Sequence, residues 1–174
     1  MENGKRNILI TEEQIQNKVK ELGALISKDY EGKNLYVLSL LRGSFIYTAD
    51  LVRQITVPTK IGFMTTSSYE HNESSSGHVK VVNDVPDDIT GYDVLIVDDI
   101  VDTGITMKFV IEHVKSLGAN SVKSCVLLDK PDRRKVEIEP DYCCFKIPDV
   151  FVVGYGLNYG DYFRNVPYVF NWEK

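Results

Sequence analysis

Cysteine, tryptophan and long apolar runs are scarce in this sequence of 174 residues, which contains one tryptophan and three cysteines. Cys125, Cys143 and Cys144 are odd in number and have no C-x-x-C spacing, so we expect buried, reduced thiols of a cytoplasmic protein rather than a disulfide scaffold. No apolar run approaches the roughly 18 residues of a membrane-spanning helix, and the polar N-terminus lacks a signal-peptide pattern. We therefore expect no membrane partner.

An excess of basic residues is absent as well. Lys and Arg number 20 against 25 Asp and Glu, giving a net charge of -5, whereas nucleic-acid phosphates require a basic face. We therefore expect no nucleic-acid partner. The chain has no G-x-x-x-x-G-K sequence, which excludes a P-loop NTPase. Three histidines lack the spacing of metal ligands: His71, His78 and His113.

The most informative segment that is present runs from Val94 to Thr106 and reads V-L-I-V-D-D-I-V-D-T-G-I-T. Its first four residues are apolar and predict a buried strand, which we expect to end at Asp98 and Asp99. From Thr106 the apolar residues recur at helical spacing until Gly118, a typical residue after a helix end. The segment therefore predicts a strand, an acidic loop and a helix.

This arrangement predicts a sugar-phosphate site. Ligands bind at the carboxyl ends of strands in open α/β sheets, and the N–H groups at the start of the following helix can bind a phosphate. Carboxylates beside a phosphate require either a divalent metal or ligand hydroxyls to offset repulsion. Asp98 and Asp99 suit both roles, because carboxylates bind a vicinal diol as well as Mg²⁺.

At these residues the sequence resembles the phosphoribosyltransferase family, whose motif is four apolar residues, two acids, two apolar residues and D-[TS]-G-x-T. Every position matches. The resemblance implies that Asp98 and Asp99 bind the ribose hydroxyls and Mg²⁺ of phosphoribosyl pyrophosphate. Asp102 is expected to be the catalytic residue that accepts a proton or stabilises charge. The 5′-phosphate is expected to contact Asp102, Thr103, Gly104, Ile105 and Thr106.

Two later segments concern the base. Ser121–Leu128 predicts a strand that brings Lys130 to the same sheet edge. A lysine there can donate to the exocyclic oxygen of a 6-oxopurine, whereas adenine has an amino donor at that position. The sequence from 145 to 164 is similar to the hypoxanthine-guanine branch of the family. This likeness implies that Phe151 stacks on the purine, that the Val152 backbone meets the ring edge and that Arg164 faces pyrophosphate.

Asn158 is the one departure from the family pattern, which commonly has L-D-Y where this chain has Leu157, Asn158 and Tyr159. The family position would bind metal on the pyrophosphate side. An asparagine there keeps an oxygen ligand but loses a charge. We therefore expect Asn158 to be a weaker metal ligand than an aspartate.

Two further segments are expected to complete the site. Leu35–Leu41 predicts a strand, and the resemblance implies that Leu41, Arg42 and Gly43 form a pyrophosphate loop with a cis bond between Leu41 and Arg42. The polar, Ser-rich stretch 67–78 predicts a surface loop. By resemblance it is a lid that excludes water, with Ser68 and Tyr69 on its hinge side.

The predicted fold is a single α/β domain, residues 1–174, with a mostly parallel twisted sheet, helices on both faces and a small hood formed from the N-terminal segment and residues about 140–174. Thr11 and Gln14 predict a capping box that opens a helix. The resemblance implies purine salvage: transfer of the phosphoribosyl group to hypoxanthine or guanine by a homodimer or homotetramer. The alternatives are a phosphoribosyltransferase for xanthine or adenine, and a non-catalytic RNA-binding regulator of the same fold.

Overall fold

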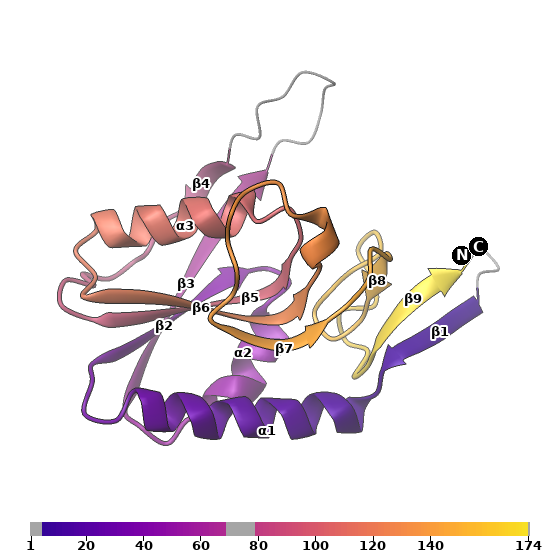
Figure 1. Cartoon of the computed structure of the whole chain (residues 1–174), viewed down its shortest axis with the longest axis horizontal. Coiled ribbons are helices and arrows are strands. Elements are labelled where there is room, and N and C mark those ends of the chain that lie inside the picture. Colours follow the sequence, from indigo (N-terminus) through magenta and orange to yellow (C-terminus); the bar gives the residue numbers. More distant parts are fainter. Residues whose placement is uncertain (1–4, 69–78, 174) are drawn as a thin grey trace.

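The computed structural model describes residues 5–68 and 79–173 (Figure 1). It contains a large sheet with helices on both faces and a smaller sheet beside it. In chain order the elements are β1 (Lys5–Ile10), α1 (Glu12–Asp29), β2 (Leu35–Leu41), α2 (Phe45–Val52), β3 (Thr59–Ser68), β4 (Val79–Asn83), β5 (Asp93–Val101), α3 (Ile105–Ser116), β6 (Ser121–Asp129), the 3₁₀ turn η1 (Pro131–Arg133), β7 (Tyr142–Lys146), β8 (Val152–Val153) and β9 (Val169–Glu173).

The large sheet has the strand order β4-β3-β2-β5-β6-β7. Every neighbouring pair from β3 to β7 is parallel, and β4 alone is antiparallel to its neighbour β3. The central strands β2 and β5 are almost wholly buried, which explains why they appear in the sequence as continuous apolar runs. The prediction of a mostly parallel sheet is confirmed.

Strand β5 extends further than the sequence suggested. We expected it to end at Asp98 and Asp99, but it continues to Val101. The reason is pairing with β6, which matches Asp98 with Val126 and Ile100 with Leu128. The acidic pair therefore belongs to a strand end fixed on the sheet, and the loop proper begins at Asp102.

Helices cover both faces of the large sheet, as predicted. On one face α1 and α2 contribute Ile15, Val19, Leu22, Tyr47 and Leu51 to a core that includes β2 and β5. On the other face α3 contributes Met107, Val110 and Val114 to a second core. The capping box of α1 forms, with the Gln14 N–H donating to Thr11 Oγ1 at 3.2 Å and the Thr11 N–H to Gln14 Oε1 at 2.8 Å.

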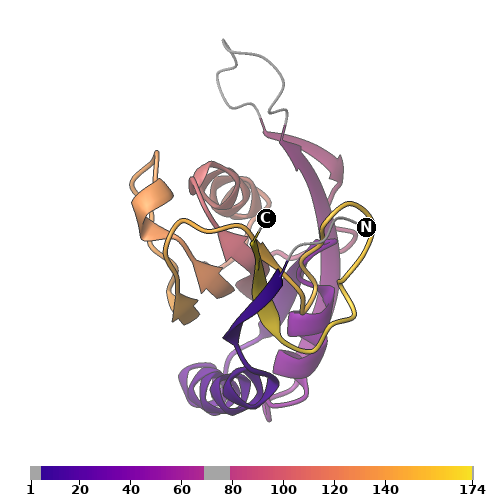
Figure 2. The same cartoon turned by 90° about the vertical axis from the view of Figure 1, so that its right-hand side faces the viewer.

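The hood is a three-stranded antiparallel sheet of order β1-β9-β8, so it joins the two ends of the described chain. Figure 2 shows it in front of the large sheet, and in Figure 1 the arrowhead of β7 points toward it. We predicted that the hood would start near residue 140. It starts later, because residues 142–146 form β7, which pairs with β6 in the large sheet.

Other expectations concern the cysteines and the membrane. All three cysteines are free thiols; Cys125 and Cys144 are buried, and Cys143 is partly exposed. Cys143 and Cys144 are adjacent on β7, so their different exposure follows from the alternation of side chains along a strand. None of the described helices has the length and apolar character needed to cross a bilayer.

Candidate active site

Three parallel strands bring the predicted site residues to one edge of the large sheet. Strand β2 ends at Leu41, β5 leads into Asp102, and β6 leads into Lys130. These strands are neighbours in the order β2-β5-β6 and run in the same direction. Their carboxyl ends therefore converge, which is the position where open α/β sheets bind ligands.

The loop from Asp102 to Thr106 has the features of an anion site. Gly104 precedes α3 with a φ of 82°, a conformation that favours glycine. The first turn of α3 has neither an acidic residue nor a side-chain cap. The Ile105 N–H lies 3.4 Å from Thr103 Oγ1, and the Lys108 N–H begins the helical series by donating to the Gly104 carbonyl oxygen at 2.9 Å. The remaining N–H groups and the positive end of the helix dipole can bind a phosphate.

The segment after β6 closes one side of this loop. The Lys135 N–H donates to the Thr103 carbonyl oxygen at 2.9 Å. A Cβ at residue 104 would lie 2.5 Å from Ile138 Cγ2, so the contact leaves no room for a side chain there. Gly104 is thus required both by its backbone conformation and by close packing.

Asp98 and Asp99 form a partly buried acidic pair. Burial raises the pKa of both carboxyls; repulsion from Asp99 raises that of Asp98 further, and the charge of Arg164 partly opposes the rise at Asp99. Among the described residues, no lysine or arginine forms an ion pair with either carboxylate. The doubly ionised pair is therefore poorly compensated, and ligand hydroxyls or a cation can stabilise it.

This donor set fits Mg²⁺. The described residues hold no group of three or more His, Cys, Asp and Glu placed to bind a metal. Mg²⁺ commonly takes one or two carboxylates from the protein and completes its shell with substrate phosphates and water. Two adjacent carboxylates without a cationic partner match that pattern better than they match a metal cage built from protein alone.

The predicted pyrophosphate loop packs directly on the acidic pair. The peptide bond between Leu41 and Arg42 is cis, as the resemblance implied. A Cβ at residue 43 would lie 1.7 Å from Asp99 Oδ2, so the glycine allows the backbone to reach the carboxylate. From the other side, a Cβ at residue 156 would lie 2.1 Å from the Gly43 carbonyl oxygen. Arg164 Nη1 donates to the Gly156 carbonyl oxygen at 2.6 Å. Residues from β2, β5 and the hood thus meet around Gly43.

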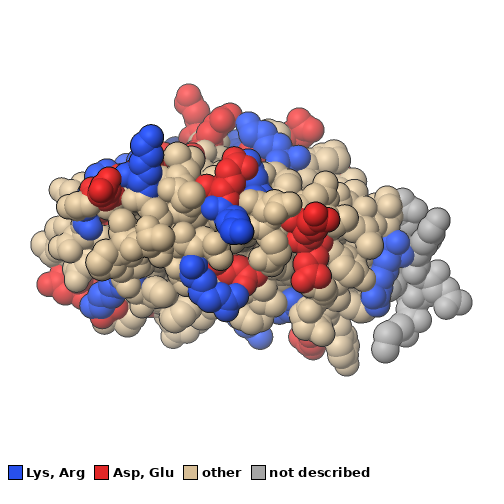
Figure 3. Space-filling model, turned by 90° about the horizontal axis from the view of Figure 1, so that it is seen from below, with Lys and Arg blue, Asp and Glu red and all other residues tan. Residues whose placement is uncertain are grey.

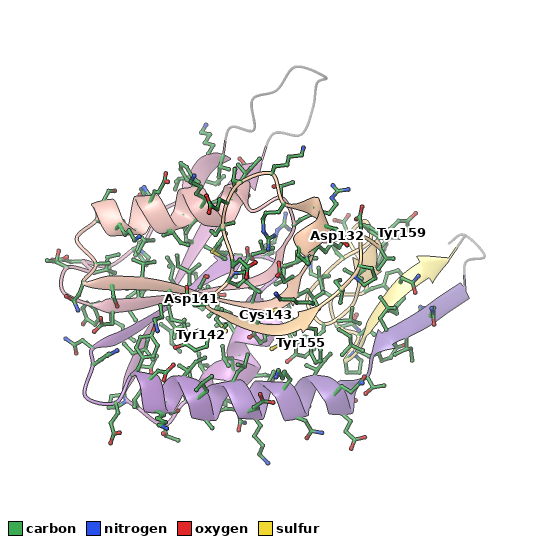
Figure 4. All side chains as sticks on the ribbon, viewed as in Figure 1. Asp132, Asp141, Tyr142, Cys143, Tyr155 and Tyr159 are labelled. Atoms are coloured by element: carbon green, nitrogen blue, oxygen red, sulfur yellow. The ribbon has the colours of Figure 1, made fainter. Side chains whose placement is uncertain are left out.

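The base end of the site contains Lys130, Phe151 and Val152. The Lys130 side chain is 9% exposed, and its Nζ lies 3.7 Å from Asp149 Oδ1. The Phe151 ring is exposed and forms a T-shaped pair with the Tyr159 ring, with the ring centroids 5.9 Å apart. Val152 is buried and pairs with β9. Figure 4 shows Tyr159 and Asp132, which follows Lys130 in the chain by two residues, at the same end of the molecule.

Two arginines at this edge, Arg133 and Arg134, were not assigned a role from the sequence. Arg133 Nε lies 2.9 Å from Asp102 Oδ1, and its Nη1 lies 3.4 Å from Asp149 Oδ2. Arg134 forms an ion pair with buried Asp129 and donates to the Asp102 carbonyl oxygen at 2.8 Å. The available signal was the D-K-P-D-R-R sequence, which places two arginines three and four residues after Lys130.

Two other predicted roles concern Asn158 as a metal ligand and residues 67–78 as a lid. Asn158 is partly buried, and its amide nitrogen donates to the Gly160 carbonyl oxygen within the same turn. Ser68 is the last residue of β3, while Tyr69 and the rest of the expected lid lie outside the described residues.

Comparison with known proteins assigns the family. The family model for a phosphoribosyl transferase domain matches residues 9–160. The chain belongs to the phosphoribosyltransferase family. It is 51% identical over 162 residues to the hypoxanthine-guanine phosphoribosyltransferase of Lactococcus lactis, an alignment covering 93% of this chain and 88% of that protein.

Solved structures of the family agree with this assignment. A hypoxanthine phosphoribosyltransferase from Staphylococcus aureus has a TM-score of 0.92 and 46% identity, covering 96% of this chain and 91% of that one. A Trypanosoma cruzi hypoxanthine phosphoribosyltransferase, studied for the role of its C-terminal region in oligomeric state and enzymatic activity, has a TM-score of 0.91 and 38% identity, covering 98% and 93%. The phosphoribosyltransferase fold predicted from the sequence is confirmed.

Proposed function

We propose that this phosphoribosyltransferase acts in purine salvage, transferring the 5-phosphoribosyl group of phosphoribosyl pyrophosphate to hypoxanthine and guanine. The products are IMP or GMP and pyrophosphate. The observation that carries the proposal is the convergence at one sheet edge of an anion loop, an acidic pair that forms no ion pair with the described lysines and arginines, and a buried lysine. A phosphate, a ribose diol and a 6-oxopurine oxygen need these three kinds of partner.

In the proposed reaction a purine ring nitrogen forms a bond to C1′ of the ribose while the bond from C1′ to pyrophosphate breaks. The purine nitrogen loses its proton, for which Asp102 is the acceptor. Thr103, Gly104, Ile105 and Thr106 hold the 5′-phosphate through backbone N–H groups and hydroxyls. Asp98 and Asp99 bind the ribose hydroxyls, which fixes C1′ opposite the base.

The base and the leaving group have their own partners. Lys130 donates to the exocyclic oxygen of the purine, Phe151 stacks on the ring and the Val152 backbone meets its edge. Leu41, Arg42 and Gly43 bind pyrophosphate from one side and Arg164 from the other. Ser68 and Tyr69 flank the proposed lid.

We propose Mg²⁺ as the cofactor, held by Asp98, Asp99 and the Asn158 side-chain oxygen. When bound, the cation would neutralise charge that accumulates on departing pyrophosphate. Asp98 and Asp99 supply the negative charge for it, since the described lysines and arginines form no ion pair with them.

We also propose that the enzyme is cytoplasmic and acts as a homodimer or homotetramer. Free, largely buried thiols are consistent with a reducing compartment.

The proposed assembly is argued from strand β3. Ile61 and Phe63 on β3 are 42% and 49% exposed, and as alternate residues they lie on one face of the strand. Residues 59–64 of β3 pair only with β2 within the described chain, which leaves their other backbone edge unpaired there. We assign a second copy of the chain to this part of β3, with Ile61 and Phe63 as its apolar contacts.

The test is to mix the protein with phosphoribosyl pyrophosphate, Mg²⁺ and hypoxanthine, guanine, xanthine or adenine, and to measure nucleotide and pyrophosphate. Turnover of the first two bases is expected. Turnover of xanthine or adenine alone would reassign the base. Salt-dependent RNA binding without turnover would favour the regulator; in the view of Figure 3, acidic and basic side chains are interspersed rather than gathered into a basic face.

A further inference from the structure

Four residues of alternating charge form a row at the edge of the large sheet where the candidate site lies. Lys130 lies 3.7 Å from Asp149, Asp149 lies 3.4 Å from Arg133, and Arg133 lies 2.9 Å from Asp102. These four residues come from different segments: the loop after β5, the end of β6, η1 and the turn before β8. The row therefore connects the base end of the site with the phosphate loop.

Arg133 is the residue that makes this connection. Its guanidinium uses two different nitrogens for two carboxylates, Nε for Asp102 and Nη1 for Asp149. A planar guanidinium presents its donors in fixed directions, whereas a lysine has a single ammonium group on a flexible chain. Arg133 can thus fix the relative placement of Asp102 and Asp149.

We propose that Arg133 is a positioning residue that aligns Asp102 and, through Asp149, Lys130 for catalysis. This inference rests on the function proposed above. The substrate carries several phosphates, so two uncompensated carboxylates at the rim would repel it and would move away from it. Asp149 without Arg133 would also hold Lys130 more strongly, at the expense of the hydrogen bond from Lys130 to the purine. Arg133 does not itself contact the reacting atoms.

The experiment measures kcat and KM for hypoxanthine and for phosphoribosyl pyrophosphate in the whole enzyme and in three variants. Arg133→Ala should lower kcat/KM for hypoxanthine by roughly 3- to 10-fold, the scale of one partly exposed charge-assisted hydrogen bond. Arg133→Lys should recover part of the loss, because it restores the charge without the two-nitrogen geometry. Lys18→Ala is the control: its ion pair with Glu21 is also partly exposed but lies on α1, and its activity should be unchanged.

A double-mutant cycle separates positioning from a merely structural role. If Arg133 acts through Asp149, the loss in Arg133→Ala/Asp149→Asn should be smaller than the product of the two single losses. The midpoint of thermal unfolding of Arg133→Ala should stay within about 2 °C of the parent, since its ion pairs are half exposed.

Three results would overturn the inference: activity of Arg133→Ala equal to that of the parent, fully multiplicative losses in the cycle, or an equal loss in Lys18→Ala. The proposed function fails separately, by a parent enzyme that turns over neither hypoxanthine nor guanine. If the parent enzyme is active and Arg133→Ala has the same kcat/KM as the parent, only the role of Arg133 is contradicted.

Discussion

Asp102 is the first residue of the proposed phosphate loop, and its carboxylate forms an ion pair with Arg133. We expect Asp102→Asn to bind both substrates but to lower kcat by roughly 10² to 10⁴, the usual effect of losing a general base. Steady-state kinetics with hypoxanthine measures this. An unchanged kcat would remove Asp102 from the chemical step.

Asn158 stands where the family commonly has an aspartate, and a neutral amide oxygen offers a cation only a dipole. If it binds Mg²⁺, Asn158→Asp should lower the Mg²⁺ concentration that gives half-maximal activity, by about tenfold for a gain of roughly 1.4 kcal/mol in cation binding. Activity titrated against Mg²⁺ for both proteins decides the point. Superimposed curves would mean that residue 158 is not a ligand.

At the scale of elements, the loop after β2 and the end of β5 depend on one small residue. Gly43→Ala places a methyl group 1.7 Å from the Asp99 carboxylate, so the loop or the carboxylate must move. We expect the KM for phosphoribosyl pyrophosphate to rise about tenfold and the free energy of unfolding to fall by about 1 to 3 kcal/mol.

Gly32→Ala is the control for this variant, because Gly32 has a positive φ but no atom near its Cβ position. It should lower stability by about 1 kcal/mol and leave the KM unchanged. A normal KM in Gly43→Ala would show that the contact between the loop and Asp99 is not needed for substrate binding.

The reactivity of the Cys143 thiol follows from the position of strand β7 in the sheet. Burial, together with the negative charge of Asp129, raises the pKa of the Cys143 thiol to about 11. Only the thiolate reacts with alkylating reagents, and a raised pKa keeps the thiol protonated at neutral pH. The rate of Cys143 alkylation by iodoacetamide should therefore be about 100-fold below that of an ordinary thiol at pH 7 and should still rise between pH 9 and pH 10. Mass spectrometry after timed quenching measures it, with Cys143→Ser as the blank, and a plateau below pH 9 would contradict the shift.

Local patterns predicted local structure well. The strand Leu35–Leu41 has the predicted bounds, since a continuous apolar run suits a strand buried on both faces. The helix start at Thr11 and the turn at Gly104 were also predictable, because caps and left-handed turns depend on a few neighbouring residues. The end of β5 was not, because pairing with β6 extends it past two aspartates.

The site was predictable only in part, for a related reason. The motif around Asp98 predicts a ligand by itself, since its residues are contiguous. The contacts of Gly156 with Gly43 and of Arg133 with Asp102 join residues that are far apart in the chain, and no periodicity in either segment encodes them. They result from the way the hood and the turn after β6 fold back over the sheet edge.

At the scale of the whole molecule, self-association is the proposal that most needs a direct test. Phe63→Glu places a charge on the apolar edge of β3, and desolvating it at an interface would cost several kcal/mol, so the variant should shift to monomer. Light scattering after size-exclusion chromatography measures the mass. Leu25→Glu on α1 alters a residue of similar exposure and should keep the parent mass. An unchanged mass in Phe63→Glu would assign the interface to another surface.

The pairing of β1 with β9 also orders events during protein synthesis. Of the described strands a ribosome makes β1 before all others and β9 after all others, so the β1 partner in the hood is synthesised only after the rest of the fold. The phosphate loop and the acidic pair emerge in the middle, while Arg164 and the turn that holds Gly156 emerge near the end. A nascent chain would therefore display the proposed sugar-phosphate site without the residues proposed to bind pyrophosphate. Catalytic competence is expected to appear abruptly, when β9 leaves the exit tunnel and closes the hood.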